Sequence, residues 1–362
     1  MSDKNIHLEH IEDQILNLGT KGARDSISLL QKGFVATVKY DGSPAVFAGT
    51  DPSDGKFFVA KKSVFNKTPI LYKTPGQIKK ADLPNDLKDK FAIALQEFKK
   101  LGIQGVIQGD IMFTKSDLKT VNKTFVKFQP NTITYRLPKV QTNGKSIGVV
   151  WHTQYKGETL DTMSASFDFD IAQLKQTKNV WMRDAKHSNG FVNVDVKHIK
   201  APVGITKFLN TQKLFPSKLI GAKFKTFNNL DVKAGKQTTN SLQHALAYPT
   251  FVSKRYDIEI DKLKTAKAKE ALQLKKQQVV SILLKEVRAI QSVTEFQIAL
   301  TEAKHKVIQQ LNETQDIACF IGKEKTNPEG YVAVGKKGAV KLVNRLEFSY
   351  NNFNGIKQWQ KQ

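Results

Sequence analysis

The chain of 362 residues contains a single cysteine, Cys319. One cysteine excludes an internal disulfide bond and every zinc site built from several cysteines, and it favours a reducing compartment. No run approaches the roughly 18 continuous apolar residues that a membrane-spanning helix requires. The first residues also lack the apolar core of a secretion signal. We therefore expect a cytoplasmic protein that makes no contact with a membrane.

Acidic residues are scarce relative to basic ones. The sequence has 57 Lys and Arg against 33 Asp and Glu, a formal net charge of +24 at pH 7. This charge favours a polyanionic partner, of which nucleic acid is the commonest, although solubility or lysine-rich codon usage is an alternative explanation. Only six of the 57 basic residues are arginine, the residue better suited to reading base edges. We expect contact with nucleic-acid phosphates without sequence-specific reading of bases.

The residue pattern predicts an α+β fold in which a β-rich core is interrupted by helices. The 40% of hydrophobic residues is enough for a sizeable core. Helical periodicity occurs over the first 30 residues, broken at Gly19 and Gly22, and again at 87–101, 256–290 and 294–311. Runs typical of strands are 34–38, 45–48, 57–60, 105–113, 124–128, 147–152, 330–334 and 339–343. The predicted domains are a core over 1–204 and 313–362, and a helical insertion over 205–312.

Two histidines near the start suggest two alternatives. His7 and His10 lie among Glu9, Glu12 and Asp13, a composition compatible with a metal site. The same residues are typical of a helix start, where acidic side chains interact favourably with the positive end of the helix dipole. We favour the helix start.

The most informative local feature is the segment 38–44, with the sequence VKYDGSP. Lys39 ends an apolar strand, and Asp-Gly two residues later turns the chain. A lysine beside apolar neighbours loses its proton more easily than a solvated one, and the neutral amine is a nucleophile. By itself the Lys-x-Asp-Gly pattern is short and weakly specific.

This segment resembles the nucleotide-attachment motif of the covalent nucleotidyltransferase superfamily, which contains ATP-dependent DNA and RNA ligases and mRNA capping enzymes. Four further segments resemble the family's later motifs in their order along the chain: 109–111 (GDI), 149–152 (VVWH), 328–332 (PEGYV) and 340–343 (VKLV). The resemblance implies a ligase-type core of antiparallel sheets with flanking helices. It also implies the cofactors ATP and Mg²⁺ or Mn²⁺.

The resemblance assigns the catalytic roles to four residues. Lys39 would attack the α-phosphate of ATP and carry AMP as a lysyl-AMP intermediate, and Lys341 would neutralise the phosphate charge. Asp110 and Glu329 would hold the divalent metal ion, for which carboxylate oxygens are suitable ligands. Nucleotidyl transfer needs this neutralisation of charge more than it needs elaborate covalent chemistry.

The resemblance also assigns a nucleotide-binding set. Asp41 and Gly42 belong to the attachment motif, and Asp41 would orient the sugar or the nucleophile. Ser63 falls where the family has a ribose-contacting segment. Trp151 would stack on adenine, with burial in the core as the alternative for a tryptophan in a strand. Asp110, Glu329 and Lys341 would contribute to the same binding site.

Three departures from the family pattern affect the expected reaction. Pro44 stands where DNA ligases commonly have arginine, and Ser43 is closer to some RNA ligases. Asp110 is one methylene shorter than the usual glutamate, and Val343 replaces a second lysine of the last motif, with Arg345 nearby. These departures leave self-nucleotidylation better supported than strand sealing, and they slightly favour RNA over DNA.

We therefore expect an ATP-dependent polynucleotide ligase that acts on RNA or DNA strand ends, with a monomer as the default state. The alternatives are a non-catalytic nucleic-acid-binding protein on a degenerate ligase core and a GTP-using capping-type enzyme. About 20 residues follow Lys341, too few for a C-terminal OB-fold, so the helical insertion is the expected accessory part. Its lysines are expected to contact the phosphodiester backbone, with a solvated helix face as the alternative: 262, 264, 267, 269, 275 and 276.

Three segments also resemble a group of proteins encoded by tailed phages. They are 7–13 (HLEHIED), 39–45 (KYDGSPA) and 341–345 (KLVNR). This resemblance implies that the protein works in the cytoplasm of a phage-infected host cell.

Overall fold

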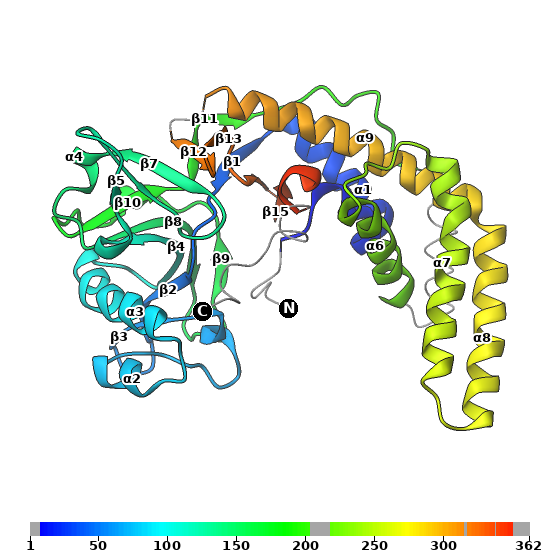
Figure 1. Ribbon diagram of the computed structural model, residues 1–362, viewed down its shortest axis with the longest axis horizontal. Helices are drawn as coiled ribbons and strands as arrows, with labels where there is room; N and C mark the ends of the chain where they lie inside the picture. The colour runs from blue at the N-terminus through cyan, green and yellow to red at the C-terminus, as the bar shows by residue number, and fades with distance from the viewer. Residues whose placement is uncertain (1–7, 203–217, 315–316, 337, 350–362) are drawn as a thin grey trace. The chain divides into compact units, whose positions relative to one another are not determined.

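The computed structural model describes residues 8–202, 218–314, 317–336 and 338–349 (Figure 1). The chain divides into two compact units, which we call the sheet unit and the helical unit. The sheet unit comprises Met1–Leu8, Val35–Gly190 and Leu311–Val334, and the helical unit comprises Glu9–Phe34, Phe191–Gln310 and Gly335–Gln362. Helices and several antiparallel sheets are both present, which confirms the predicted α+β class.

The units differ in extent from the predicted domains. The helical unit contains most of the predicted insertion, whose boundary at residue 205 lies outside the described residues. It also contains the first helix and the segment after Gly335, which the sequence analysis assigned to the core. The reason is a set of contacts between residues distant in sequence, because Glu12 pairs with Lys304 and Arg345.

The main sheet of the sheet unit has the strand order β10-β8-β4-β2-β3, and β9 pairs with β8. β4 is antiparallel to both β2 and β8, whereas β10 is parallel to β8. The strands are β2 Ala45–Thr50, β3 Phe57–Ala60, β4 Val106–Thr114, β8 Ile147–Lys156, β9 Ser164–Ser166 and β10 Val180–Asp184.

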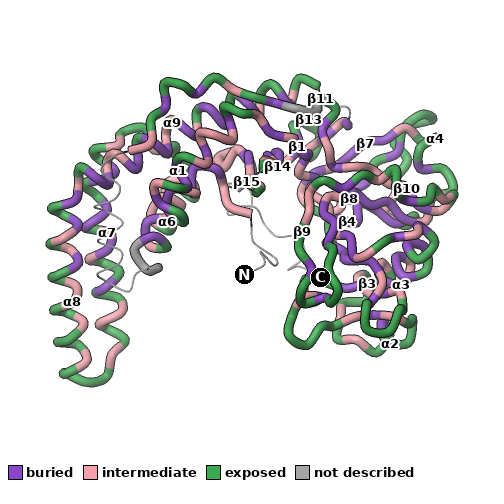
Figure 2. The backbone as a smooth tube through the Cα atoms, turned by 180° about the vertical axis from the view of Figure 1, so that it is seen from behind, coloured by how far each residue is buried: buried purple, intermediate pink, exposed green. Residues whose placement is uncertain are grey.

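The main core of the sheet unit lies on one face of this sheet (Figure 2). Alternate residues of β8, among them Val149 and Trp151, point to this face and pack with residues of α2 (Pro75–Lys80) and α3 (Asn85–Phe98). The opposite face carries a smaller apolar cluster around Phe47, Val64 and Tyr155. The short helix η2, Lys62–Phe65, covers this second face, which also carries the candidate site.

Two further sheets complete the sheet unit. The five-stranded sheet has the order β13-β12-β7-β6-β5, and the strand β1 lies between β11 and β14 in the other. Their strands are β5 Lys119–Thr120, β6 Phe125–Phe128, β7 Thr134–Pro138, β12 Ala318–Ile321, β13 Glu324–Thr326, β1 Phe34–Lys39, β11 Lys186–Val192 and β14 Gly330–Gly335. Short helices are η3 Lys99–Leu101, η4 Lys115–Asp117, α4 Lys139–Thr142 and η5 Ile171–Gln173.

In its described residues, the helical unit consists mainly of five long helices (Figure 1). They are α1 Gln14–Lys32, α6 Lys218–Lys233, α7 Ser241–Asp261, α8 Ala266–Lys285 and α9 Val287–Asn312, whose last two residues belong to the sheet unit. The unit also includes η1 Ile11–Asp13, the strand β15 Gly338–Leu342 and the π-helix η6 Arg345–Ser349. Among the described helices, none combines the length and apolarity needed to cross a membrane.

Two glycines explain the irregular first helix. Gly19 has φ 61° and ψ −141°, a conformation that favours glycine, and it kinks α1 as predicted. After the kink the chain passes close to its own start, because a Cβ atom at Gly22 would lie 2.1 Å from the carbonyl oxygen of Gln14. Any larger residue at Gly22 would force these two turns apart.

The prediction of one helix over 256–290 is wrong. The structure divides this stretch among α7, α8 and α9. Thr265 begins α8 as an N-cap, with its side chain accepting a hydrogen bond from the Ala268 N–H at 3.3 Å. The composition is favourable for a helix throughout, so propensity alone did not reveal the turn that folds α7 and α8 into an antiparallel pair.

Candidate functional site

Lys39 forms an ion pair with Glu329 in the sheet unit. Lys39 is the last residue of β1 and pairs in register with Gly330, the first residue of β14, so Glu329 lies directly beside it. The Lys39 Nζ atom donates a hydrogen bond to Glu329 Oε2. The exposed fractions of the two side chains are 30% and 16%, so the pair is accessible from solvent. The structure thus joins two predicted site residues 290 positions apart.

Asp41 holds the turn that follows Lys39. Its carboxylate accepts hydrogen bonds from Asn131 Nδ2 at 2.7 Å and from the backbone N–H groups of Thr132 and Ile133 at 2.6 and 2.9 Å. Its own N–H donates to the Tyr135 hydroxyl at 2.8 Å. The Asp41 carboxylate therefore fixes the loop through protein donors, and its predicted role in orienting the sugar or the nucleophile stays a prediction.

Gly42 brings the loop against the predicted metal ligand Asp110. A Cβ atom at Gly42 would lie 2.4 Å from the Cβ atom of Asp110, so only glycine fits here. Backbone hydrogen bonds of 3.0 Å, from Ser43 to Ile111 and from Ile111 to Pro44, fix the same contact. Gly42 therefore positions the loop against β4. This close packing is a structural reason for the glycine in the Lys-x-Asp-Gly motif.

Asp110 and His152 face each other on neighbouring strands, with 3.8 Å between Asp110 Oδ2 and His152 Nε2. Burial raises the pKa of Asp110 to about 7, against the opposing effect of the Lys39 charge. Burial, followed by the Lys39 charge, lowers the pKa of His152 to about 4. At neutral pH the histidine is therefore uncharged, and the carboxyl group is partly protonated.

Trp151 does not line the site. Its side chain is fully buried in the main core, with its ring centroid 5.1 Å from that of Phe98. The ladder between β4 and β8 skips His152, because Thr153 pairs with Gln108 and Trp151 pairs with Gly109. This β-bulge leaves Trp151 in the core and His152 beside Asp110. The predicted stacking of Trp151 on adenine is thus corrected, and His152 is the site residue that the sequence analysis missed.

Ser63 lies on η2, which covers the face of the main sheet that carries Asp110. Asp110 shares this face with Phe47, because their partners in the β2–β4 ladder alternate without interruption. The neighbours of Ser63 anchor η2 there: Val64 is fully buried, and the Phe65 ring lies 4.5 Å from that of Tyr155. Ser63 itself is half-buried, on the helix that covers the Asp110 face of the sheet.

Lys341 lies on β15 in the helical unit. Its backbone N–H donates to the Glu9 carbonyl at 2.8 Å, and it forms a parallel bridge with His10. Burial lowers the pKa of His10, and the charges of Arg345 and Lys341 lower it further. Lys341 thus belongs to a different compact unit from the other predicted site residues.

Two carboxyl groups of the sheet unit, those of Asp110 and Glu329, are of a type that can bind a divalent cation. Among the described residues, the Asp110 carboxyl group accepts no hydrogen bond, and Lys39 neutralises Glu329. No group of three or more His, Cys, Asp or Glu side chains suited to a metal ion occurs in the described part of the chain. Mg²⁺ commonly takes one or two carboxylates and completes its shell with substrate phosphates and water.

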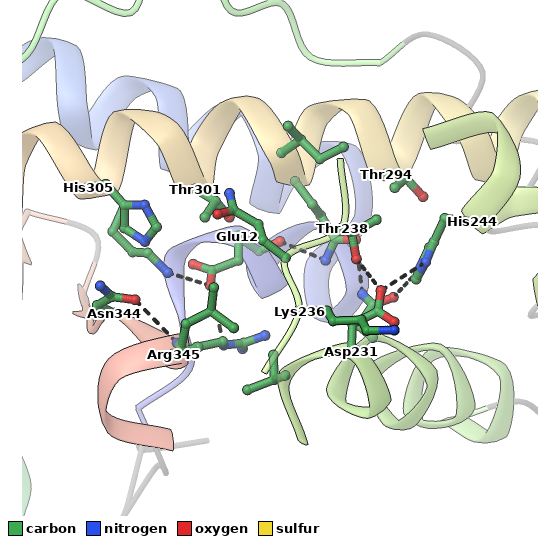
Figure 3. Close-up of a pocket in the computed structure, with 17 residues that line it drawn as sticks. Glu12, Asp231, Lys236, Thr238, His244, Thr294, Thr301, His305, Asn344 and Arg345 are labelled. Atoms are coloured by element: carbon green, nitrogen blue, oxygen red, sulfur yellow. Dashed lines mark hydrogen bonds and ion pairs between the residues drawn. The ribbon is translucent and has the colours of Figure 1, made fainter. Parts of the chain in front are cut away.

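The helical unit contains a second cluster of charges beside a cavity of about 90 Å³ (Figure 3). Lys304, fully buried, donates to Glu12 Oε1 at 2.6 Å, and Arg345 Nε lies 3.3 Å from the same oxygen. Burial acts to raise the pKa of Glu12, but the charges of Lys304 and Arg345 outweigh it and lower that pKa. Glu12 and Asp13 lie at a helix start as predicted, in η1 directly before α1, and they also form this ion-pair network. His7 lies outside the described residues.

One family model matches almost the whole chain. It is described as "Family of unknown function (DUF6267)" and matches residues 5–357. No curated protein and no solved structure matches the chain.

Proposed function

Because the chain belongs to the DUF6267 family, whose function is unknown, we propose its function from the geometry of the sheet unit. The protein is an ATP-dependent polynucleotide ligase that works through a lysyl-AMP intermediate on Lys39. Its fold is a ligase-type nucleotidyltransferase core with a helical accessory part. RNA ends are slightly favoured over DNA ends, and the cytoplasm of a phage-infected cell is the proposed site of action.

The convergence of three residues carries this proposal. Lys39 is hydrogen-bonded to Glu329, and its charge also acts on Asp110, although the three come from distant parts of the sequence. A lysine, two carboxyl groups and a loop fitted closely onto one of them form a suitable set for nucleotidyl transfer. If the Lys39–Glu329 ion pair had only a structural role, it would not require the loop at Gly42 to lie so close to Asp110.

The first step forms a phosphoramidate bond. The lone pair of the Lys39 Nζ attacks the α-phosphorus of ATP, the bond to the oxygen bridging the β-phosphate breaks, and pyrophosphate leaves. Nζ loses a proton in this step. Glu329 already accepts a hydrogen bond from that nitrogen, which supports it as the proton acceptor.

Asp110 and Glu329 would hold Mg²⁺ or Mn²⁺, which neutralises phosphate charge when bound. AMP then passes from Lys39 to the 5′-phosphate of a strand, which restores the free amine. A 3′-hydroxyl attacks that phosphate, the strand is sealed, and AMP leaves. The variant Lys341→Met tests the predicted role of Lys341 in neutralising phosphate charge.

A second candidate is a non-catalytic nucleic-acid-binding protein built on the same core. The observation that favours it is the burial of Trp151, since no aromatic platform for the purine is available from that residue. In this case Lys39 and Glu329 would form a solvent-accessible ion pair without chemistry.

Labelling with α-³²P nucleotides separates these proposals. The protein is incubated with labelled ATP or GTP and Mg²⁺, then denatured and separated on a gel. Lys186 provides a matched control for Lys39, because its side chain is 32% exposed and pairs with Asp168 at 3.1 Å. We expect an acid-stable label from ATP in the wild type and in Lys186→Met, and none in Lys39→Met.

The outcomes are distinct. No label from either nucleotide supports the non-catalytic candidate, and label from GTP alone supports a capping-type enzyme. Label that persists in Lys39→Met contradicts the assignment of the nucleophile. Mass spectrometry of the labelled peptide identifies the modified lysine, and assays with nicked RNA, nicked DNA and single-stranded RNA then define the substrate.

A further inference from the structure

Three helices of the helical unit bring cationic side chains to one place. Lys223 comes from α6, Arg255 from α7 and Lys275 from α8. Arg255 is exposed, and Lys223 and Lys275 are half-buried. We call these three residues the three-helix cluster.

Contacts between the helices fix the position of this cluster. The Lys223 Nζ atom lies 4.1 Å from the centre of the Tyr256 ring and 3.7 Å from Glu259 Oε1, which places α6 against α7. Lys276 donates to Asp257 at 2.5 Å. The neighbouring Lys275 therefore lies alongside the part of α7 that contains Asp257. The cluster therefore belongs to a packed face and not to independent surface side chains.

The charges within the cluster are not balanced. Glu259 is the acidic group that faces Lys223, whereas Arg255 and Lys275 both add positive charge beside it. Burial lowers the pKa of Lys223, and the two neighbouring cations lower it further. A bound anion would relieve this repulsion and would be attracted by the whole face.

Exposed lysines also lie around the tip of the α7–α8 pair. From Ser241 to Lys285 the chain has nine Lys and Arg against four Asp and Glu. Between Lys267 and Lys275, α8 rises roughly 12 Å, so the cluster and the tip are far enough apart to contact different phosphates. Four exposed lysines surround the tip: Lys262, Lys264, Lys267 and Lys269.

We propose that the three-helix cluster and the adjoining tip bind the phosphodiester backbone of a nucleic-acid strand. The proposal rests on the proposed function, since it names the surface that holds the ligase substrate. A nucleic-acid strand is a polyanion that suits this concentration of positive charge, and lysine contacts phosphates as a point charge without reading bases. The sequence analysis named Lys276 as a phosphate contact, but its ion pair with Asp257 commits it to the helix packing.

Salt-dependent binding tests this surface. A fluorescein-labelled strand of about 20 nucleotides, as RNA or as DNA, is titrated with protein between about 50 and 300 mM KCl, and anisotropy gives the affinity. Each phosphate contact on a single strand contributes about 0.7 to the slope of log K against log[salt]. In Lys223→Gln/Arg255→Gln/Lys275→Gln the slope should fall by about 2, with at least roughly tenfold weaker binding near 100 mM.

Two further variants serve as controls for this result. Lys79→Gln/Lys80→Gln/Lys99→Gln removes the same charge from exposed lysines on α2 and η3, and we expect it to leave the slope within about 0.5 of the wild type. Lys223 is half-buried, so Arg255→Gln/Lys275→Gln provides a milder change, for which the slope should fall by about 1.4. Circular dichroism confirms that each variant is folded.

Three results would overturn the proposal: an unchanged slope in both cluster variants, an equal fall in the control, or an effect on binding to anionic lipid vesicles without one on the strand. Adduct formation on the wild-type protein is measured separately. A fall in slope without an adduct supports the surface and contradicts the ligase proposal. An adduct with an unchanged slope contradicts the surface alone.

Discussion

Two of the lysine–glutamate ion pairs in the described part of the chain lie in opposite environments. In the sheet unit, Lys39 and Glu329 have side chains that are 30% and 16% exposed. In the helical unit, Lys304 and Glu12 have side chains that are 1% and 5% exposed. The first pair joins the ends of two strands, whereas the second joins an N-terminal segment to the middle of a long helix.

This comparison shows how burial divides structural from chemical roles. Glu12 receives charge from both Lys304 and Arg345, so the buried network is neutralised internally and inaccessible to a triphosphate. The accessible pair has a neighbouring carboxyl group, Asp110, that accepts no hydrogen bond among the described residues. The same two residue types therefore form a buried ion pair in one unit and an ion pair accessible from solvent in the other.

Removing the buried lysine should have the largest effect on stability. Lys304→Met keeps most of the side-chain volume but leaves Glu12 with Arg345 as its main cationic partner. Breaking a buried ion pair from one side costs about 3–5 kcal/mol, and we expect a loss near the lower end. Urea denaturation measures the free energy of unfolding. A loss of less than about 1 kcal/mol would show that the two pairs do not differ as proposed.

Removing the charge of Asp110 should change the dependence of stability on pH. Because burial raises its pKa to about 7, the folded state binds a proton more tightly than the unfolded state. This stabilisation is complete below about pH 4 and is lost as the pH rises through about 7. Measured in EDTA between pH 4 and 8, the wild type should lose about 2–3 kcal/mol relative to Asp110→Asn.

Added Mg²⁺ extends the pH experiment on Asp110 to the binding of a cation. A cation bound by Asp110 favours the ionised carboxylate, so it should reduce the loss of stability at high pH in the wild type and not in Asp110→Asn. Parallel pH profiles for the two proteins in EDTA would contradict the proposed environment of Asp110.

Gly42→Ala should disturb the accessible site from its backbone. The new Cβ atom would lie 2.4 Å from Asp110 Cβ, so we expect a loss of about 1–2 kcal/mol and slower labelling of Lys39. Gly76→Ala is the control, since its nearest neighbour would be 3.9 Å away, and it should be neutral or slightly stabilising. Equal thermal stability of the two variants would show that the loop is not fixed against Asp110.

The smallest effect on stability should come from Lys39 itself. Partly exposed ion pairs contribute about 0–1 kcal/mol, so Lys39→Met should unfold at nearly the wild-type urea concentration. The same substitution should remove all labelling by ATP. If Lys39→Met lowered the free energy of unfolding by several kcal/mol, Lys39 would have a structural role. The proposed difference between Lys39 and Lys304 would then be wrong.

Much of the local structure could be predicted, because it depends on neighbouring residues. The apolar run of β1, the kink at Gly19 and the turn at Asp41 and Gly42 are visible in short segments. The turn between α7 and α8 was missed, since Thr265 lies in a stretch whose composition favours helix throughout. Helix propensity differs by less than about 1 kcal/mol between most residues, too little to define such a boundary.

The sequence by itself determined the α+β class, the excess of positive charge and the residues available for the candidate site. Only the tertiary structure decided which of them meet. A bulge in β8 directs His152 toward Asp110 and keeps Trp151 in the core, and the β1–β14 register brings Glu329 to Lys39. The burial of Glu12 with Lys304 depends likewise on packing between segments far apart in the chain. Such pairings are set by long-range packing and strand register, which local sequence patterns do not encode.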